Sequence, residues 1–262
     1  MNFLARLLLL LMLLSLVGQA QPWQIESTSQ PGSLGHGASF VVKKLAGPGK
    51  AEMKLVFFGE KQCQLRVVAN ADRESARSLQ AIGHAEKALA ACNGGYFHAD
   101  GDFGPTGLEI TDGRRVGTYE GQPLFGALVV RQGKNALVWG PEFQDSPDIT
   151  QAVQCSPWLV SEGRMVPLAP QGTDPRNNRT FILTDGEGRW AIGICKGVGL
   201  LELAHILVTP GIITEMKVKR ALNLDGGPST SLWCRSAAGV DFFEVPGWAV
   251  RNMIVVVPRD SQ

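Results

Sequence analysis

Residues 221–228 read Ala-Leu-Asn-Leu-Asp-Gly-Gly-Pro, and the rest of the sequence is best interpreted outward from this stretch. An apolar segment of strand length ends at Asp225 and is followed at once by two glycines. Paired glycines let a backbone turn tightly and approach a ligand closely, and successive N–H groups in such a turn can bind an anion. The hydroxyl residues Ser229, Thr230 and Ser231 come next. The stretch predicts a strand that ends in a polar site, with an ordinary Asp-Gly turn as the alternative.

Residues 89–97 repeat this design as Leu-Ala-Ala-Cys-Asn-Gly-Gly-Tyr-Phe. Here the apolar segment ends at Asn93, and the aromatic residues Tyr96 and Phe97 follow the two glycines. Either segment alone is most simply a turn, because Asn-Gly and Asp-Gly favour turns. Two segments of one design, the first followed by aromatic rings and the second by hydroxyls, favour a shared functional site.

Two further segments carry arginines in polar surroundings. Residues 174–180 read Asp-Pro-Arg-Asn-Asn-Arg-Thr and contain Arg176 and Arg179, and Arg251-Asn252 stands just before the last apolar run. A guanidinium group can form two parallel hydrogen bonds to a phosphate or a carboxylate. A solvated loop is the simpler interpretation of 174–180 taken alone.

The remaining chain consists mainly of short apolar runs between glycine-rich or charged turns, which is typical of strands. Strands are expected over 39–43, 54–58, 64–68, 87–92, 108–111, 115–119, 126–130, 136–139, 181–184, 190–195, 221–224 and 253–257. We expect helices over 73–82, 149–154 and 200–207, and a loose segment over 21–37. Many strands and few helices, without strict alternation, predict an α+β fold with a strand-rich mixed or antiparallel sheet core and a few packing helices.

The first twenty residues have the order of a secretory signal: Arg6, an apolar run over 7–14, and the small-x-Ala sequence Gly18-Gln19-Ala20. The run is too short to span a bilayer, which needs about 20 apolar residues. We therefore expect a signal peptide over 1–20, an N-terminal lead-in over 21–50 and one domain over 51–262. The mature protein is expected to be periplasmic or secreted, without stable membrane insertion.

Charge and cysteine spacing narrow the classes of partner. The chain has 25 basic and 24 acidic side chains and no basic run, so nothing favours a nucleic-acid partner. The five cysteines include no C-x-x-C pair and no zinc spacing, and their odd number leaves at least one outside any intramolecular disulfide. His98, Asp100 and Asp102 could hold Ca²⁺, although an acidic turn is favoured. We expect neither a metal nor a cofactor.

Taken together in chain order, these segments resemble the phosphodiester glycosidase family. The resemblance spans roughly residues 50–258 and is carried by 93–97, Arg179-Thr180, 200–204, 221–227 and Arg251-Asn252. It implies a hydrolase that breaks the C1–O bond of a sugar-1-phosphodiester, such as an N-acetylglucosamine-1-phosphodiester. The products would be a free sugar and a phosphomonoester.

This reaction implies roles for the candidate residues. A phosphomonoester is a weakly basic leaving group, so the site needs anion stabilisation, while the positive charge that develops on the sugar needs a carboxylate. We assign Asp225 as that carboxylate, Arg179 to the phosphate, and Asn93 to the sugar hydroxyls or to the orientation of Asp225. The expected substrate-binding residues are Gly94, Gly95, Tyr96, Arg176, Thr180, Asn223, Gly226, Gly227, Ser229, Thr230 and Arg251.

Several points stay open from the residues alone. Tyr96, Phe97 and Trp233 are candidates for a wall against which the sugar stacks. A second carboxylate could be Asp100, Asp102 or Glu109. Two other functions also fit the sequence: a metal-dependent phosphodiesterase that cuts the P–O bond, and a non-catalytic protein that binds a phospho-glycan.

Overall fold

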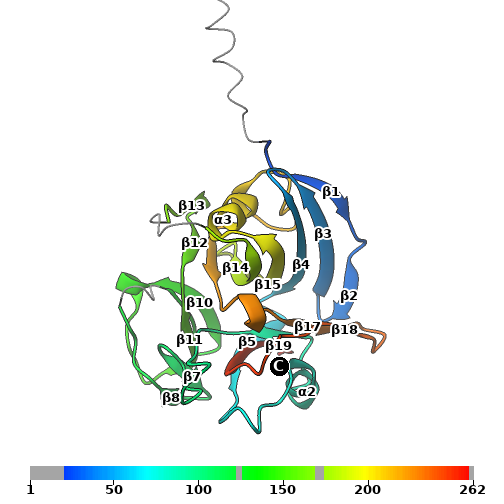
Figure 1. The fold of residues 1–262 in the computed structure, drawn as a ribbon. Helices are drawn as coiled ribbons and strands as arrows, with labels where there is room; N and C mark the ends of the chain where they lie inside the picture. Colours follow the sequence, from blue (N-terminus) through cyan, green and yellow to red (C-terminus); the bar gives the residue numbers. More distant parts are fainter. Residues whose placement is uncertain (1–20, 122–125, 169–173, 260–262) are drawn as a thin grey trace, which may run out of the picture.

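The structure is a computed structural model that describes residues 21–121, 126–168 and 174–259 (Figure 1). The expected signal peptide over 1–20 lies outside the described residues. Three sheets make up the fold, and all pairings between their strands are antiparallel. Within the described residues two α-helices, α2 and α3, pack on these sheets, so the predicted strand-rich α+β fold is confirmed and its sheets are antiparallel.

The largest sheet has nine strands in the order β1-β3-β4-β15-β14-β16-β12-β13, with β2 paired to β3. These strands are β1 (Gln24–Thr28), β2 (Gly32–Gly35), β3 (Ala38–Ala46), β4 (Lys50–Gly59), β12 (Trp158–Ser161), β13 (Arg164–Met165), β14 (Asn177–Thr184), β15 (Arg189–Val198) and β16 (Arg220–Asn223). The segment 21–37 was expected to be loose, and this expectation is wrong. It forms β1 and β2 at the edge of the sheet, and the segment 21–50 therefore contributes strands to the fold.

The second sheet has five strands in the order β10-β9-β11-β7-β8. Their bounds are β7 (Glu109–Thr111), β8 (Arg114–Val116), β9 (Gly126–Arg131), β10 (Lys134–Trp139) and β11 (Ile149–Cys155). The short helix expected over 149–154 is wrong. This segment is the central strand β11, which pairs with β9 on one side and β7 on the other, because only a strand satisfies the backbone groups of both neighbours.

The third sheet also has five strands, in the order β18-β17-β6-β19-β5. They are β5 (Cys63–Ala69), β6 (Ala90–Asn93), β17 (Leu232–Arg235), β18 (Asp241–Glu244) and β19 (Asn252–Pro258). Helix α2 (Leu79–Ala85) lies beside this sheet (Figure 1). The expected helix over 73–82 begins later, because the side chain of Ser78 caps the N–H of Ala81 while Asp72 closes a separate turn with Ser75.

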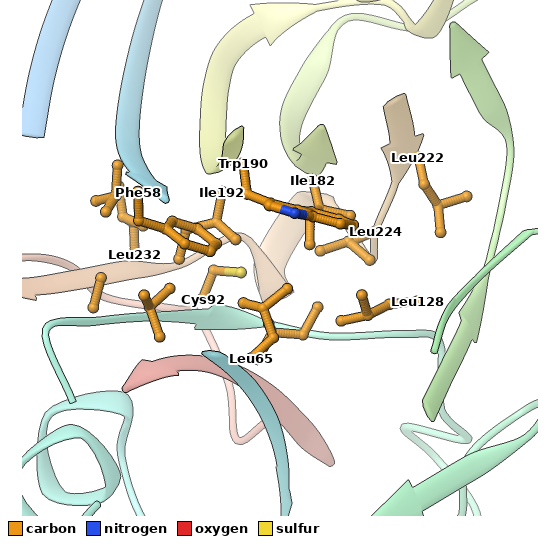
Figure 2. Packing of buried hydrophobic residues seen from close by; sticks show 14 of the residues in the cluster. Phe58, Leu65, Cys92, Leu128, Ile182, Trp190, Ile192, Leu222, Leu224 and Leu232 are labelled. Carbon is orange, nitrogen blue, oxygen red and sulfur yellow. The ribbon is translucent and has the colours of Figure 1, made fainter. Parts of the chain in front are cut away.

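The core lies where the three sheets face one another (Figure 2). Alternate residues of the large sheet, such as Ile182 and Leu222, point toward Leu65 and Cys92 of the third sheet and Leu128 of the second. The opposite face of the large sheet is covered by helix α3 (Leu200–Val208), which confirms the helix expected over 200–207. Strands β16 and β6 therefore end close to the junction of two sheets.

All five cysteines lie within the described residues, and each is a buried free thiol. Burial raises the pKa of the Cys63 thiol to about 11 and that of Cys234 to about 12. In the described part of the chain, no helix is long and apolar enough to cross a membrane.

Candidate active site

The two Gly-Gly segments meet in space, although 132 positions separate Asn93 from Asp225. The backbone N–H of Asp225 donates to the carbonyl of Gly94 at 3.0 Å. In return the side-chain Nδ2 of Asn93 donates to the Asp225 carbonyl at 2.7 Å. Since β6 belongs to the third sheet and β16 to the large sheet, these bonds join the ends of strands from two sheets at one point.

Asn93 is the anchor of this junction. Its side chain is buried, and its Oδ1 accepts hydrogen bonds from the Thr180 hydroxyl at 2.8 Å and the Ser231 N–H at 3.0 Å. Thr180 is also fully buried and lies on β14, next to β16 in the large sheet. The amide of Asn93 is thus engaged within the protein, and of the two roles expected for it, the contacts match the orientation of Asp225.

The glycines of the two segments serve different purposes. A Cβ at Gly94 would collide with Asn252 Oδ1, and a Cβ at Gly95 would come 2.5 Å from the carbonyl of Gln154. These two glycines therefore permit close packing of the chain on β19 and β11. Gly227 has a φ of +58°, a left-handed conformation that favours glycine, and it begins the 3₁₀ turn η2 (Gly227–Ser229) two residues after Asp225.

Asp225 is a partly buried carboxylate with an elevated pKa. Burial raises the pKa of this carboxyl from its ordinary 3.8 to about 6, because the charged form loses hydration. Two hydrogen bonds oppose the rise: the N–H of Gly226 donates to Oδ1 at 2.9 Å, and the Ser229 hydroxyl also bonds the carboxylate. Asp225 therefore changes charge near pH 6, a range in which general acid–base and nucleophilic carboxylates commonly operate.

Arg179 supplies the positive charge of the site. Its Nε donates to the Val198 carbonyl at 3.1 Å and its Nη2 to the Pro175 carbonyl at 2.7 Å. Within the described ranges, no carboxylate forms an ion pair with it. A Cβ at Gly226 would lie 3.8 Å from Arg179 Cδ, which places the arginine beside the Asp225 turn. A guanidinium held only by carbonyl groups keeps its charge available for an anionic ligand.

Tyr96 lies within the electrostatic reach of both charges, since Asp225 raises and Arg179 lowers its pKa. Its hydroxyl donates to the Ser156 carbonyl at 2.7 Å and accepts from Asn223 Nδ2 at 3.3 Å. Burial is the largest influence and keeps this phenol neutral. Tyr96 and Asn223 are therefore bonded to each other and to the Ser156 carbonyl close to Asp225.

Two buried polar atoms near Asp225 lack a partner in the part of the chain that the structure describes. They are Oδ1 of Asn223, two residues before Asp225, and Oγ1 of Thr230, next to Ser229. Buried polar groups without partners are uncommon and often mark functional positions. Both residues were expected to bind substrate.

The other arginines expected to bind substrate form ion pairs with carboxylates of the protein, Arg176 at the surface and Arg251 in the interior. Arg176 forms an ion pair with Glu202 at 2.6 Å, and Arg251 pairs with the buried Glu109 at 2.7 Å. Glu109 also accepts from Asn252 Nδ2 at 2.7 Å. Glu109, one of the candidate second carboxylates, thus balances the charge of Arg251, and phosphate binding by either arginine stays a prediction.

Two of the remaining candidates, Trp233 and Asp102, are held in the core and in a turn. Trp233 is fully buried, so the expectation that it forms a sugar-stacking wall is wrong. Asp102 bonds the N–H of Gly104 at 2.9 Å and approaches His98 Nδ1 at 3.1 Å, as an acidic turn does. Across the described ranges, no group of three or more histidine, cysteine or carboxylate side chains is arranged to hold a metal ion.

One residue of the site was not found from the sequence. Trp248 lies in the loop between β18 and β19, and its Nε1 donates to the Ser229 hydroxyl at 2.7 Å. The sequence contains only a weak signal for this role. Trp248 follows Val245-Pro-Gly, a turn sequence, so it belongs to no predicted apolar strand or helix whose packing would explain a tryptophan.

These features define the protein first as an antiparallel α+β protein in which a carboxylate of raised pKa and a guanidinium held by carbonyl groups lie at one turn. The family model for phosphodiester glycosidase matches residues 86–257. The chain therefore belongs to the phosphodiester glycosidase family, as its sequence segments predicted, and is an enzyme of that type.

Solved structures share the fold. The catalytic domain of zebrafish N-acetylglucosamine-1-phosphodiester alpha-N-acetylglucosaminidase, auto-inhibited by its pro-peptide, is 15% identical with a TM-score of 0.63; the alignment covers 93% of this chain and 96% of that one. A hypothetical protein from Synechocystis is 16% identical with a TM-score of 0.55, over 85% and 62% of the two chains. A search of curated proteins finds no match. At these identities the structural likeness concerns the fold.

Proposed function

We propose that this protein hydrolyses the C1–O bond of a sugar-1-phosphodiester and releases a free sugar and a phosphomonoester. The observation that carries the proposal is the presence at one turn of Asp225, a carboxylate that ionises near pH 6, and of Arg179, a guanidinium held only by carbonyl groups among the described residues. Arg179 lies against the turn that follows Asp225, since a Cβ at Gly226 would lie 3.8 Å from Arg179 Cδ.

Each charge suits one half of this reaction. As the C1–O bond breaks, positive charge develops on the sugar ring, and an ionised Asp225 would stabilise it as nucleophile, as base or by its charge alone. Negative charge gathers on the departing phosphate, where Arg179 would neutralise it. Water supplies a hydroxyl to C1 and a proton to the released phosphate, so the products balance.

A single carboxylate at the site also fits the leaving group. Glycosidases whose leaving group is the alkoxide of another sugar use a second carboxylic acid to protonate its oxygen. A phosphomonoester has a second pKa of about 6 and leaves without that help. Glu109, the one candidate second carboxylate that is buried, is held by Arg251 and Asn252.

N-acetylglucosamine-1-phosphodiesters are the first substrates to test, since the zebrafish enzyme with the same fold is named for that substrate. The signal-like order of residues 1–20 supports action in the periplasm or outside the cell. The proposed substrate is a small sugar-phosphodiester or phospho-glycan, and neither nucleic acid nor membrane insertion is part of the proposal.

The test incubates residues 21–262 with uridine diphosphate N-acetylglucosamine in ¹⁸O-labelled water and identifies the products by mass spectrometry. Cleavage at C1–O yields N-acetylglucosamine and unlabelled uridine diphosphate. The phosphate is the decisive fragment, because the hydroxyl at C1 of a free sugar exchanges with water. Asp225→Asn is the inactive control, and Asp145→Asn, at an exposed ion pair with Arg115, is the matched active control.

Other outcomes would identify the other candidate functions. Labelled uridine diphosphate, or uridine monophosphate with N-acetylglucosamine 1-phosphate, means P–O cleavage and overturns the proposal. Loss of that activity with a chelator would then identify a metal-dependent phosphodiesterase. Binding without any product, measured by calorimetry over a panel of sugar phosphates, would indicate a phospho-glycan-binding protein.

A further inference from the structure

The loop that carries Trp248 is fastened to the turn that follows Asp225. The N–H of Gly247 donates to the Pro228 carbonyl at 2.6 Å, and Trp248 Nε1 donates to Ser229 Oγ at 2.7 Å. Pro228 and Ser229 belong to η2, which begins two residues after Asp225. Two consecutive residues of one loop thus bind two consecutive residues of the other.

The bond from Trp248 determines what the Ser229 hydroxyl can do. An indole N–H can only donate, so the Ser229 oxygen must accept from it. A hydroxyl has a single proton, which this bond leaves free, and the Asp225 carboxylate, four residues earlier at the start of the same turn, is the acceptor whose pKa Ser229 lowers. Ser229 is fully buried, so bulk water does not compete for the proton.

The ring of Trp248 remains open to solvent. The residue is 42% exposed, whereas Trp23, Trp158 and Trp233 are almost completely buried. On one side it meets Phe97 edge to face, with the ring centroids 6.4 Å apart. Phe97 in turn meets Phe103 edge to face at 5.2 Å. Phe103, Phe97 and Trp248 thus form an aromatic row. The row is connected to both Gly-Gly segments, because Phe97 ends the first segment and Trp248 donates a hydrogen bond to Ser229, which follows the second.

An exposed aromatic face beside a catalytic carboxylate matches the chemistry of a sugar. One face of a pyranose ring carries C–H groups and packs on flat aromatic rings, while its hydroxyls remain free for polar groups. Tyr96, which the sequence suggested for this wall, has its hydroxyl bonded to Ser156 and its ring partly buried against the core. Trp248 offers the exposed ring that Tyr96 and Trp233 do not.

We infer that Trp248 has two roles in the proposed reaction: its ring binds the sugar of the substrate, and its Nε1 positions the Ser229 hydroxyl on Asp225. The inference rests on the proposed function for the identity of the ligand. It makes Trp248 a binding residue through its ring and a positioning residue through its nitrogen, and the two roles can be separated by substitution.

Trp248→Phe keeps an aromatic face and removes the N–H, whereas Trp248→Ala removes both. For uridine diphosphate N-acetylglucosamine, the alanine variant should raise KM roughly tenfold and the phenylalanine variant should stay within about threefold of wild type. Phe243→Ala is the matched control, because Phe243 is an exposed aromatic residue of β18, 49% accessible, outside this row. Thermal unfolding of each variant verifies that it is folded.

The positioning role has its own measurement. Without the Trp248 N–H, the Ser229 hydroxyl is free to turn from Asp225, so the acid limb of the pH–rate profile should move up by roughly one pH unit in Trp248→Phe. The titratable groups that face Asp225 are Tyr96 and Cys155, and burial keeps both neutral near pH 6. NMR titration of the Asp225 carboxyl carbon in wild type and Trp248→Phe measures the same shift without turnover.

The possible results separate the two proposals. A KM unchanged in Trp248→Ala overturns the binding role, and an Asp225 titration unchanged in Trp248→Phe overturns the positioning role. If the wild type forms no product, the proposed reaction fails. Calorimetry with N-acetylglucosamine 1-phosphate then tests the ring directly: tenfold weaker binding by Trp248→Ala, but not by Phe243→Ala, supports the binding role, and no binding by wild type overturns it.

Discussion

Replacing Asp225 with asparagine should abolish activity and yet stabilise the folded protein above pH 6. Burial raises the pKa of this carboxyl from 3.8 to about 6. At about 1.36 kcal/mol per pKa unit, keeping the charged form in the folded protein costs about 3 kcal/mol. Asparagine has nearly the same shape, carries no charge, and keeps an oxygen that accepts the Gly226 N–H.

The sign of the pH dependence follows from which state holds the proton more tightly. The unfolded chain loses the proton near pH 3.8, whereas the folded protein keeps it until about pH 6. Rising pH therefore favours the unfolded chain across this window. The cost is absent below pH 3.8, grows between pH 3.8 and 6, and is complete above pH 6.

The assay compares the free energy of unfolding of wild type and Asp225→Asn in urea at several pH values between 3.5 and 8. The advantage of the variant should grow by up to about 3 kcal/mol over this range, or about 6–12 °C in Tm for a chain of this size. Asp145→Asn, which removes an exposed ion pair with Arg115, should change stability by less than about 1 kcal/mol at every pH.

The reasoning would be refuted by an Asp225→Asn variant whose stability difference from wild type is the same at pH 3.5 and pH 8. That result would mean that Asp225 titrates normally and is well hydrated in the folded protein. Activity retained in this variant would separately remove Asp225 from the mechanism. Together the two readouts distinguish a buried functional charge from an ordinary surface carboxylate.

Three further predictions concern Arg179, Asn93 and the cysteines. Arg179→Lys should lower kcat/KM for the sugar-phosphodiester by roughly 10²-fold, measured by steady-state kinetics, whereas Arg189→Lys on the neighbouring strand should leave it unchanged. Asn93→Ala should lower the free energy of unfolding in urea by about 2–4 kcal/mol, because the Thr180 hydroxyl and the Ser231 N–H lose their buried acceptor; a loss equal to that of an exposed Asn178→Ala would contradict this. In denaturant without reductant, a thiol reagent should modify all five cysteines, whereas the native protein should react slowly because the thiols are buried. Modification of fewer than five cysteines in denaturant would reveal a disulfide.

Local apolar patterns were sufficient to predict most of the fold. The run over 253–257 lies inside β19 because it is a continuous apolar stretch of strand length, and 200–207 forms α3 almost to the residue because its apolar residues recur at helical spacing. Strand β1 escaped prediction for the opposite reason. Its five residues are all exposed at the edge of the sheet, so burial imposed no pattern on the sequence.

Strand β11 was misread because polar side chains are buried along it. The side-chain oxygen of Gln151 accepts from the N–H of Val67 at 3.0 Å, and that of Gln154 accepts from the N–H of Leu108 at 3.1 Å. These glutamines complete the backbone hydrogen bonding of neighbouring segments. Their polarity hides the regular spacing that a buried strand usually shows, and no local rule reveals a partner that lies far along the chain.

The same limit applies to the site. The sequence predicted that the two Gly-Gly segments share a site, and the structure brings Asn93 and Asp225 together. The sequence could not show that Arg176 and Arg251 are already paired, nor that Trp248 reaches Ser229. Each of these contacts is set by how the sheets pack, and the residue types alone are compatible with either arrangement.

Among the described residues, the buried Glu109 and the partly buried Asp225 show two different surroundings for a carboxylate. Glu109 faces Arg251, and this ion pair compensates the burial of both charges. Asp225 has no such cation among the described residues; its bonds come from a backbone N–H and a hydroxyl, and its pKa rises to about 6. An asparagine would fill the same space without that cost. A charge kept at about 3 kcal/mol of stability, near an arginine that no carboxylate of the described ranges pairs, is what the proposed catalytic role of Asp225 requires.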